Sequence, residues 1–332
     1  MIKVGFSFLG YQINGGSDDL LIYPSDKSRS VEKCCESKSY ISCTEVKLNF
    51  DNFDKIKKKI KVAGISLEFS NEVPPKGYAY KNDKGDEAVF SYDKKTHHLF
   101  GNINTKDGKF FEIESCKSHH VFRETDQDSL TDIKDEFDDA DEVKQKFPMF
   151  GSVETATTNH TLDRTTIRII SMMFYYTRKF EEVTEDIEWV VNQALAITNQ
   201  GFINSLIPVR VEKFCIEKAT GSVYELTNPM GFLNDFKRMK GSPHKTLSTA
   251  DAAVLLHSGH SGQGTIAWPL PTEPFTWIGK DWIKIFVLGH ELGHNFGCSH
   301  DIYQPGRPHP NNPTGLGHHI EREKIKLGMQ LS

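Results

Sequence analysis

One stretch near the C-terminus, GHELGHNFGCSHD from Gly289 to Asp301, constrains the fold of this chain more than any other. His290 and His294 are four residues apart, so on a helix their imidazoles project from one face. Gly297 can adopt the left-handed conformation that ends a helix and lets the chain turn back. His300, three residues later, can then reach the same point in space. The stretch therefore predicts a helix, a sharp reversal and three converging histidines.

Three imidazoles at this spacing suit a catalytic Zn²⁺ ion, because three protein ligands leave the fourth tetrahedral position for water. Neutral ligands leave the ion its full charge, which lowers the pKa of bound water toward neutrality. Glu291 follows the first ligand and is predicted to act as general base and then as general acid toward the leaving amine. The predicted metal ligands are His290, His294 and His300, and the predicted catalytic residue is Glu291. A closed structural site is disfavoured, because such sites usually have four protein ligands and favour cysteine.

The residues upstream of this motif alternate between strand and helix patterns. The largely apolar run Ile283–Leu288, with Asp281 as a candidate cap, predicts a buried helix that reaches Phe296. Thr184 is predicted to cap an earlier helix that begins near Ile187. The alternation indicates helices packed against a largely parallel sheet. The other predicted elements are the strands Ile167–Tyr176, Pro208–Phe214 and Ala252–Leu256 and a short helix Phe232–Met239.

The N-terminal part has a different pattern, with short strands separated by Asp-Gly, Lys-Gly and Asn-rich turns from about Val4 to Arg123. Glu124 to Lys144 then holds ten acidic and two basic residues, which is typical of a solvated linker. We therefore predict a β-rich domain over 1–123, an acidic linker over 124–147 and a catalytic domain over 148–332. The strands Ala88–Tyr92, His98–Ile103 and Lys109–Ile113 are the clearest in the first domain.

Composition excludes some functions and leaves others open. No basic patch is interleaved with aromatic residues, so nucleic acid is not an expected partner. No apolar run reaches the roughly 18 residues that a membrane span needs. The first twenty residues lack a signal-peptide pattern, which indicates an intracellular chain or a missing N-terminus. The six cysteines are scattered, without a CxxC pair, and do not set the compartment. The oligomeric state stays open.

HELGHNFGCSHD fits the metzincin pattern HExxHxxGxxH, and Asp301 after the third histidine resembles the reprolysin family, which includes ADAM proteases and snake-venom metalloproteases. The segments SMMFYYT, IEWVVNQALAITNQGF, AAVLLHSG and GTIAWP resemble the order of elements in reprolysin catalytic domains. The resemblance implies an α/β (α+β) metzincin-like catalytic domain with a mixed, mostly parallel sheet and an active-site helix, after a β-rich propeptide-like domain. It also implies that Gly264–Trp268 is an edge strand to which a peptide substrate adds.

The resemblance extends to further residues. Metzincins carry a methionine in a tight turn beneath the zinc, and Met329 is the candidate here, in a context that departs from the usual pattern. If the first domain is a propeptide, the Cys116 thiolate is a candidate for the open zinc position; a disulfide or an inert buried thiol are the alternatives. Cys298 has Cys215 as a candidate disulfide partner. His257 flanks a Ser-Gly loop and is predicted to be an ordinary loop residue.

Together these features predict a zinc metalloendopeptidase made as a zymogen, with one catalytic Zn²⁺ and with proteins or peptides as substrates. The resemblance implies an extracellular setting. A catalytically inactive metzincin-fold binding protein is the alternative, which the intact Glu291 disfavours. An intracellular zinc hydrolase is a further alternative.

Overall fold

The computed structural model describes residues 19–22, 34–35, 40–49, 58–93, 95–116, 119–125, 166–219, 250–258, 266–267, 275–280, 283, 287–295, 299–301 and 316–317. The chain divides into two compact units, each with its own sheet and core. Unit 1 comprises Met1–Glu72 and Tyr78–Asp126, and unit 2 comprises Val73–Gly77 and Gln127–Ser332. Within the described residues, no helix is long and apolar enough to cross a membrane.

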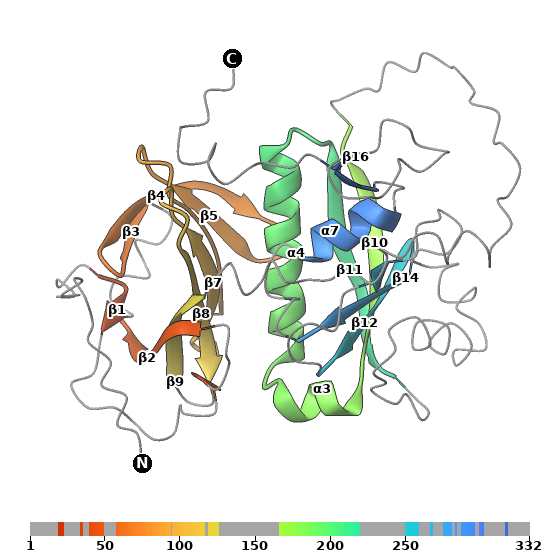
Figure 1. Ribbon diagram of the computed structural model, residues 1–332, viewed down its shortest axis with the longest axis horizontal. Helices are drawn as coiled ribbons and strands as arrows, with labels where there is room; N and C mark the ends of the chain where they lie inside the picture. Colours follow the sequence, from red (N-terminus) through yellow and green to blue (C-terminus); the bar gives the residue numbers. More distant parts are fainter. Residues whose placement is uncertain are drawn as a thin grey trace, which may run out of the picture. The chain divides into compact units, whose positions relative to one another are not determined.

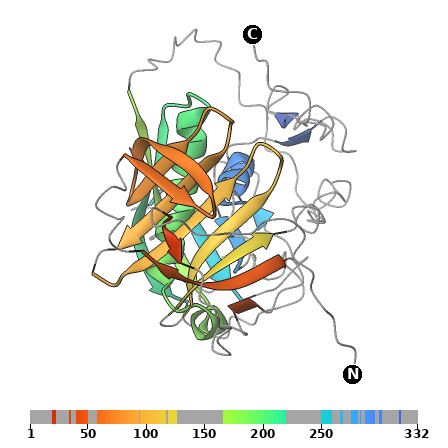
Figure 2. The same ribbon diagram turned by 90° about the vertical axis from the view of Figure 1, so that its left-hand side faces the viewer.

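Unit 1 is built on a nine-stranded sheet with the order β1-β2-β9-β8-β7-β6-β5-β4-β3 (Figure 1). The pairs β1–β2, β2–β9, β3–β4, β6–β7, β7–β8 and β8–β9 are antiparallel. The sheet curls, as the red to yellow strands show in Figure 2. The strands are β1 Leu21–Ile22, β2 Tyr40–Leu48, β3 Lys59–Val62, β4 Ile65–Val73, β5 Gly77–Lys81, β6 Glu87–Asp93, β7 His98–Asn104, β8 Phe110–Cys116 and β9 His119–Thr125.

Tight turns, and a close contact between a glycine and a Phe ring, explain why neighbouring strands of unit 1 form antiparallel pairs. Gly85 and Gly108 have φ of 91° and 83° in the turns before β6 and β8, a region that other residues rarely adopt. A Cβ on Gly101 of β7 would lie 2.0 Å from the Phe90 ring on β6, so the pairing of these two residues requires glycine. Phe90 is fully buried in the core of the unit.

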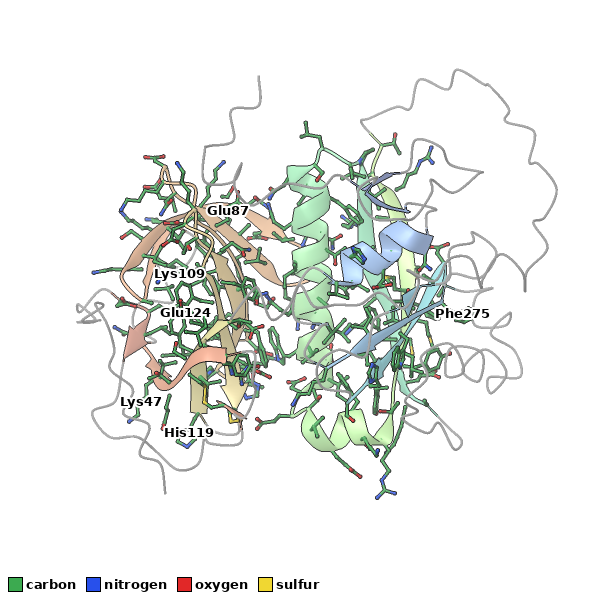
Figure 3. The ribbon with its side chains drawn as sticks, in the orientation of Figure 1. Lys47, Glu87, Lys109, His119, Glu124 and Phe275 are labelled. Atoms are coloured by element: carbon green, nitrogen blue, oxygen red, sulfur yellow. A yellow bond between two sulfur atoms is a disulfide. The ribbon has the colours of Figure 1, made fainter. Side chains whose placement is uncertain are left out.

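The predicted strands of the N-terminal part agree with β6, β7 and β8. Glu124, where the acidic linker was predicted to begin, lies in β9 and pairs with Lys109, both labelled in Figure 3, at 3.6 Å between Nζ and Oε1. Residues 126–147 of that linker are outside the described residues. The division into three domains therefore stays a prediction.

Two disulfides lie within unit 1, Cys34–Cys116 and Cys35–Cys43. The buried Arg123 contacts the first of them, since its Nη2 donates to the Cys34 carbonyl at 2.6 Å. Its Nη1 pairs with Glu114 Oε2 at 2.5 Å. The candidate role of Cys116 as a thiolate ligand of zinc is therefore wrong, because its sulfur is bonded to Cys34. The alternative, a disulfide, is confirmed.

Unit 2 holds a five-stranded sheet with the order β11-β10-β12-β14-β13 (Figure 1). The pairs β10–β11, β10–β12 and β12–β14 are parallel, and β13–β14 is antiparallel. Helices α4 and α7 pack against the sheet through one apolar cluster, to which α4 contributes Val190, Val191, Ala194 and Leu195. The elements are β10 Arg168–Tyr176, α3 Arg178–Val183, α4 Ile187–Asn204, β11 Val209–Lys218, β12 Ala252–His257, β13 Ile266–Ala267, β14 Phe275–Gly279, α7 Val287–Asn295, β15 Ser299–Asp301 and β16 Leu316–Gly317.

The N-cap of α4 differs from the prediction. Thr184 is the C-cap of α3, whereas Asp186 caps α4 and accepts a hydrogen bond from the Trp189 amide at 3.0 Å. Asp186 directly precedes the first helical residue, so its carboxylate reaches an amide of the first turn that Thr184 cannot reach. The predicted strands Ile167–Tyr176, Pro208–Phe214 and Ala252–Leu256 agree with β10, β11 and β12 to within a few residues.

The predicted fold class is wrong. We predicted an α/β (α+β) metzincin-like catalytic domain with a mixed, mostly parallel sheet, preceded by a β-rich propeptide-like domain. Antiparallel β-structure instead predominates in the part that the structure describes. Short strands joined by tight turns pair with their sequence neighbours, and such pairs are antiparallel. In the described residues, the antiparallel strands of unit 1 outnumber the parallel strands of unit 2.

The two disulfides provide a matched test of how unit 1 is stabilised. Removing Cys34–Cys116 with alanines frees a loop of 82 residues, whereas removing Cys35–Cys43 frees a loop of 8. Loop-closure entropy predicts losses of about 4.5 and about 2.5 kcal/mol in the free energy of unfolding, respectively. The measurement is urea unfolding of the full chain, with hydrogen exchange of peptides from β8 as the probe of unfolding in unit 1. Equal losses, or a larger loss for the short loop, would contradict this account.

Candidate active site

Helix α7 carries the first half of the motif. It spans Val287–Asn295, whereas the sequence predicted a helix from Asp281 to Phe296; both predicted end residues are outside the described residues. Val287, Leu288 and Leu292 are buried and belong to the apolar cluster of unit 2. Gly289 of α7 lies close to α4. A Cβ added at Gly289 would be 3.5 Å from a methyl group of Thr198. The helix is therefore held by both the sheet and α4.

The two described residues at the centre of the motif lie in different environments. His290 is exposed, whereas Glu291 is fully buried. Burial of a carboxylate is costly unless other groups compensate it. A position that required only packing would be filled better by an apolar side chain. Glu291 is thus a candidate for chemistry and not for stability alone.

The predicted ligands occupy two consecutive elements. His290 and His294 lie one turn apart on α7, and His300 lies in β15, which pairs in parallel with β16. The chain thus passes from helix to strand between Asn295 and Ser299. The side chains of His294 and His300 are outside the described residues. Among the side chains that the structure describes, no group of three or more His, Cys, Asp or Glu residues is placed to hold a metal ion. The metal ligands therefore stay a prediction.

His257 was predicted to be a loop residue, and the structure corrects this. It is the last residue of β12, only 2% exposed, and its ring stacks on Trp277 of β14 with 3.8 Å between the ring centroids. Burial lowers the pKa of His257 to about 3, so the ring is neutral near pH 7. The sequence signal was the run of five apolar residues, AAVLL, that directly precedes this histidine, because such a run predicts a buried strand that can continue to His257.

The predicted edge strand Gly264–Trp268 is represented by β13, Ile266–Ala267, at one end of the described five-stranded sheet. Ile266 pairs with Trp277, and Ala267 pairs with Thr276 of β14. Binding of a peptide along this edge stays a prediction. Cys215 has a free thiol that lies 3.6 Å from Glu217 Oε1. Gly297, Cys298, Met329 and the predicted helix Phe232–Met239 are outside the described residues.

Comparison with known proteins gives distant likenesses. No protein-family model and no curated protein matches the chain. Metalloproteinase-II from Bacteroides fragilis is similar in structure, with a TM-score of 0.45 and 12% identity, covering 75% of this chain and 84% of that chain. A structure of a chaperone-substrate complex is similar with a TM-score of 0.36 and 9% identity, covering 74% of this chain and 52% of that chain. Neither likeness assigns the chain to a family.

The buried His257 makes the stability of the chain depend on pH. Its folded pKa of about 3 lies below its unfolded pKa, so the stabilisation is complete above about pH 6.5 and is lost on acidification toward pH 3. We expect a loss of about 2 kcal/mol from this ring between pH 7 and pH 5. His257→Phe keeps an aromatic ring beside Trp277 and removes the titration. Urea unfolding of both proteins at the two pH values checks this, and an equal pH dependence would contradict it.

Proposed function

We propose that the chain is a zinc-dependent metalloendopeptidase that hydrolyses peptide bonds in protein or peptide substrates. The observation that carries the proposal is the placement of an exposed His290 next to a fully buried Glu291 on α7, with His294 one turn further on the same helix. Membership of the reprolysin family is part of the proposal, and it rests on the spacing of HELGHNFGCSHD. It does not extend to the fold class of the whole chain.

The residues present fit a zinc ion. Helix α7 is continuous from His290 to His294, and a separation of four residues places two imidazoles on one helical face. His290, His294 and His300 would hold the ion. When bound, Zn²⁺ supplies a Lewis acid that polarises the scissile carbonyl group and makes water more acidic.

The chemistry that the chain itself supplies centres on Glu291. Its carboxylate would accept the proton of the attacking water and return it to the nitrogen of the leaving amine. Because Glu291 lies on a helix packed against the sheet and α4, its backbone is held before substrate arrives. Such prior positioning lowers the entropic cost of reaching the reactive geometry.

The disulfides of unit 1 support an extracellular setting for the protein. Two disulfides among the described residues are consistent with an extracellular protein, because such bonds persist in oxidising compartments. Secretion is the finer proposal. We also propose that residues 1–123 act as a propeptide of a zymogen. Because Cys116 is bonded to Cys34, latency would arise from contacts other than a thiolate on the metal.

Replacement of the proposed base separates chemistry from metal binding. In Glu291→Gln, kcat for a denatured protein substrate should fall by about 100-fold or more, the usual scale for loss of general-base catalysis. One zinc per chain should remain, measured by elemental analysis, and a chelator should abolish the wild-type activity. Glu182→Gln, at a carboxylate that is 55% exposed on α3, is the matched control and should keep full activity.

Three outcomes of this experiment are decisive. Unchanged cleavage in Glu291→Gln would remove the proposed role of this residue. Absence of stoichiometric zinc in the wild type would remove the metal site. Zinc bound without any cleavage, both before and after limited proteolysis that releases residues 1–123, would favour the alternative of an inactive binding protein.

A further inference from the structure

Asn295, the last residue of α7, is linked to β14 through its side chain. Thr276 Oγ1 donates to Asn295 Oδ1 at 3.0 Å, and Asn295 Nδ2 donates to the carbonyl oxygen of Phe275, labelled in Figure 3, at 3.5 Å. Both polar side chains are buried, with 3% of Asn295 and 1% of Thr276 exposed. The contact is a polar link beside the apolar cluster through which the helix packs against the sheet.

The helical end of this link lies next to the proposed base. Asn295 is four residues after Glu291, so the two residues lie one above the other on the same face of α7. Both are buried. Any tilt or slide of the C-terminal turn of α7 therefore also moves the backbone of Glu291.

The sheet end of the link lies between the centre of the sheet and its edge. Thr276 pairs with Val254 of the central strand β12 on one side and with Ala267 of the edge strand β13 on the other. Thr276 thus contacts α7 through its hydroxyl group and is the backbone pairing partner of Ala267 on β13. Thr276 therefore connects α7 with the edge strand.

We propose that Asn295 and Thr276 form a positioning pair that fixes the C-terminal turn of α7 against β14, and so sets where Glu291 lies relative to the edge strand β13. The proposal rests on the proposed peptidase function. Neither residue touches substrate. Apolar packing holds the helix to the sheet but allows it to slide, whereas a buried hydrogen bond has a direction and a length. A displacement of about 1 Å at a reacting group can reduce a rate about 100-fold.

The test uses the full chain, assayed after limited proteolysis that releases residues 1–123, with near-isosteric variants, Thr276→Val and Asn295→Leu, singly and together. Thr276→Ser retains the hydroxyl group and serves as the rescue variant. Met173→Ala is the control for a general loss of stability, because Met173 is a buried residue of β10 outside the apolar cluster that holds α7. The readouts are kcat and KM for peptide cleavage, and hydrogen exchange of the α7 amides in the metal-free protein.

We expect each of Thr276→Val and Asn295→Leu to lower kcat at least tenfold, with KM changed less than threefold. Hydrogen exchange at α7 should accelerate at least tenfold in both. The double variant should be no worse than the poorer single variant, because Asn295→Leu already removes the hydrogen bond that Thr276→Val removes. Thr276→Ser should stay within twofold of the wild type. Met173→Ala should keep kcat within twofold and should accelerate exchange at α7 no more than in the rest of unit 2.

The proposal is overturned if the two single variants behave like Met173→Ala, if their losses multiply in the double variant, or if Thr276→Ser is as impaired as Thr276→Val. Failure of the proposed function has a different signature. A wild-type chain without chelator-sensitive cleavage would remove the peptidase function and its positioning role, even where exchange at α7 still responds to the variants.

Discussion

Burial of Leu288 and Leu292 in the apolar core of unit 2 sets the rotation of α7, and the environment of every other residue of the helix depends on it. With 3.6 residues per turn, fixing these two side chains toward the sheet places His290 on the opposite, exposed side. Glu291 and Asn295 fall within the buried arc. An ordinary hydrophobic contact thereby determines which polar residues of the motif meet solvent and which do not.

Unit 2 uses buried amide side chains to define helix positions at two places. Asn199 of α4 exchanges two hydrogen bonds with the backbone of Val211 on β11, at 2.8 and 3.0 Å. Asn295 of α7 is tied to β14 in a similar way. In both cases an apolar cluster supplies most of the burial, and a directional hydrogen bond supplies the register of helix against strand. The core of unit 2 thus provides both stability and defined positions of α4 and α7 against the sheet.

What the sequence could predict was local, and what it missed depended on partners far along the chain. The apolar runs and turn residues identified β6, β10, β12 and the body of α4, because these patterns arise within a few residues. The bond of Cys116 depends on Cys34, 82 residues away, and the burial of His257 depends on Trp277 on another strand. The motif placed His290, Glu291 and His294 on one helix but could not show which side chain is buried. The predicted fold class was wrong because the motif describes only the residues around it, whereas the antiparallel strands of unit 1 outnumber the parallel strands of unit 2.

Helix α7 is intrinsically weak, which explains why its ends need tertiary support. It has nine residues, VLGHELGHN, including two glycines, and a helix of that length is unstable alone in water. Leu288 and Leu292 hold its first turns in the core, and Asn295 holds its last turn. Glu291 lies between these supports. Its position therefore depends on the packing of unit 2 and not on the motif alone. In a chain without these supports, the same sequence motif would not hold the glutamate where it could act as a base.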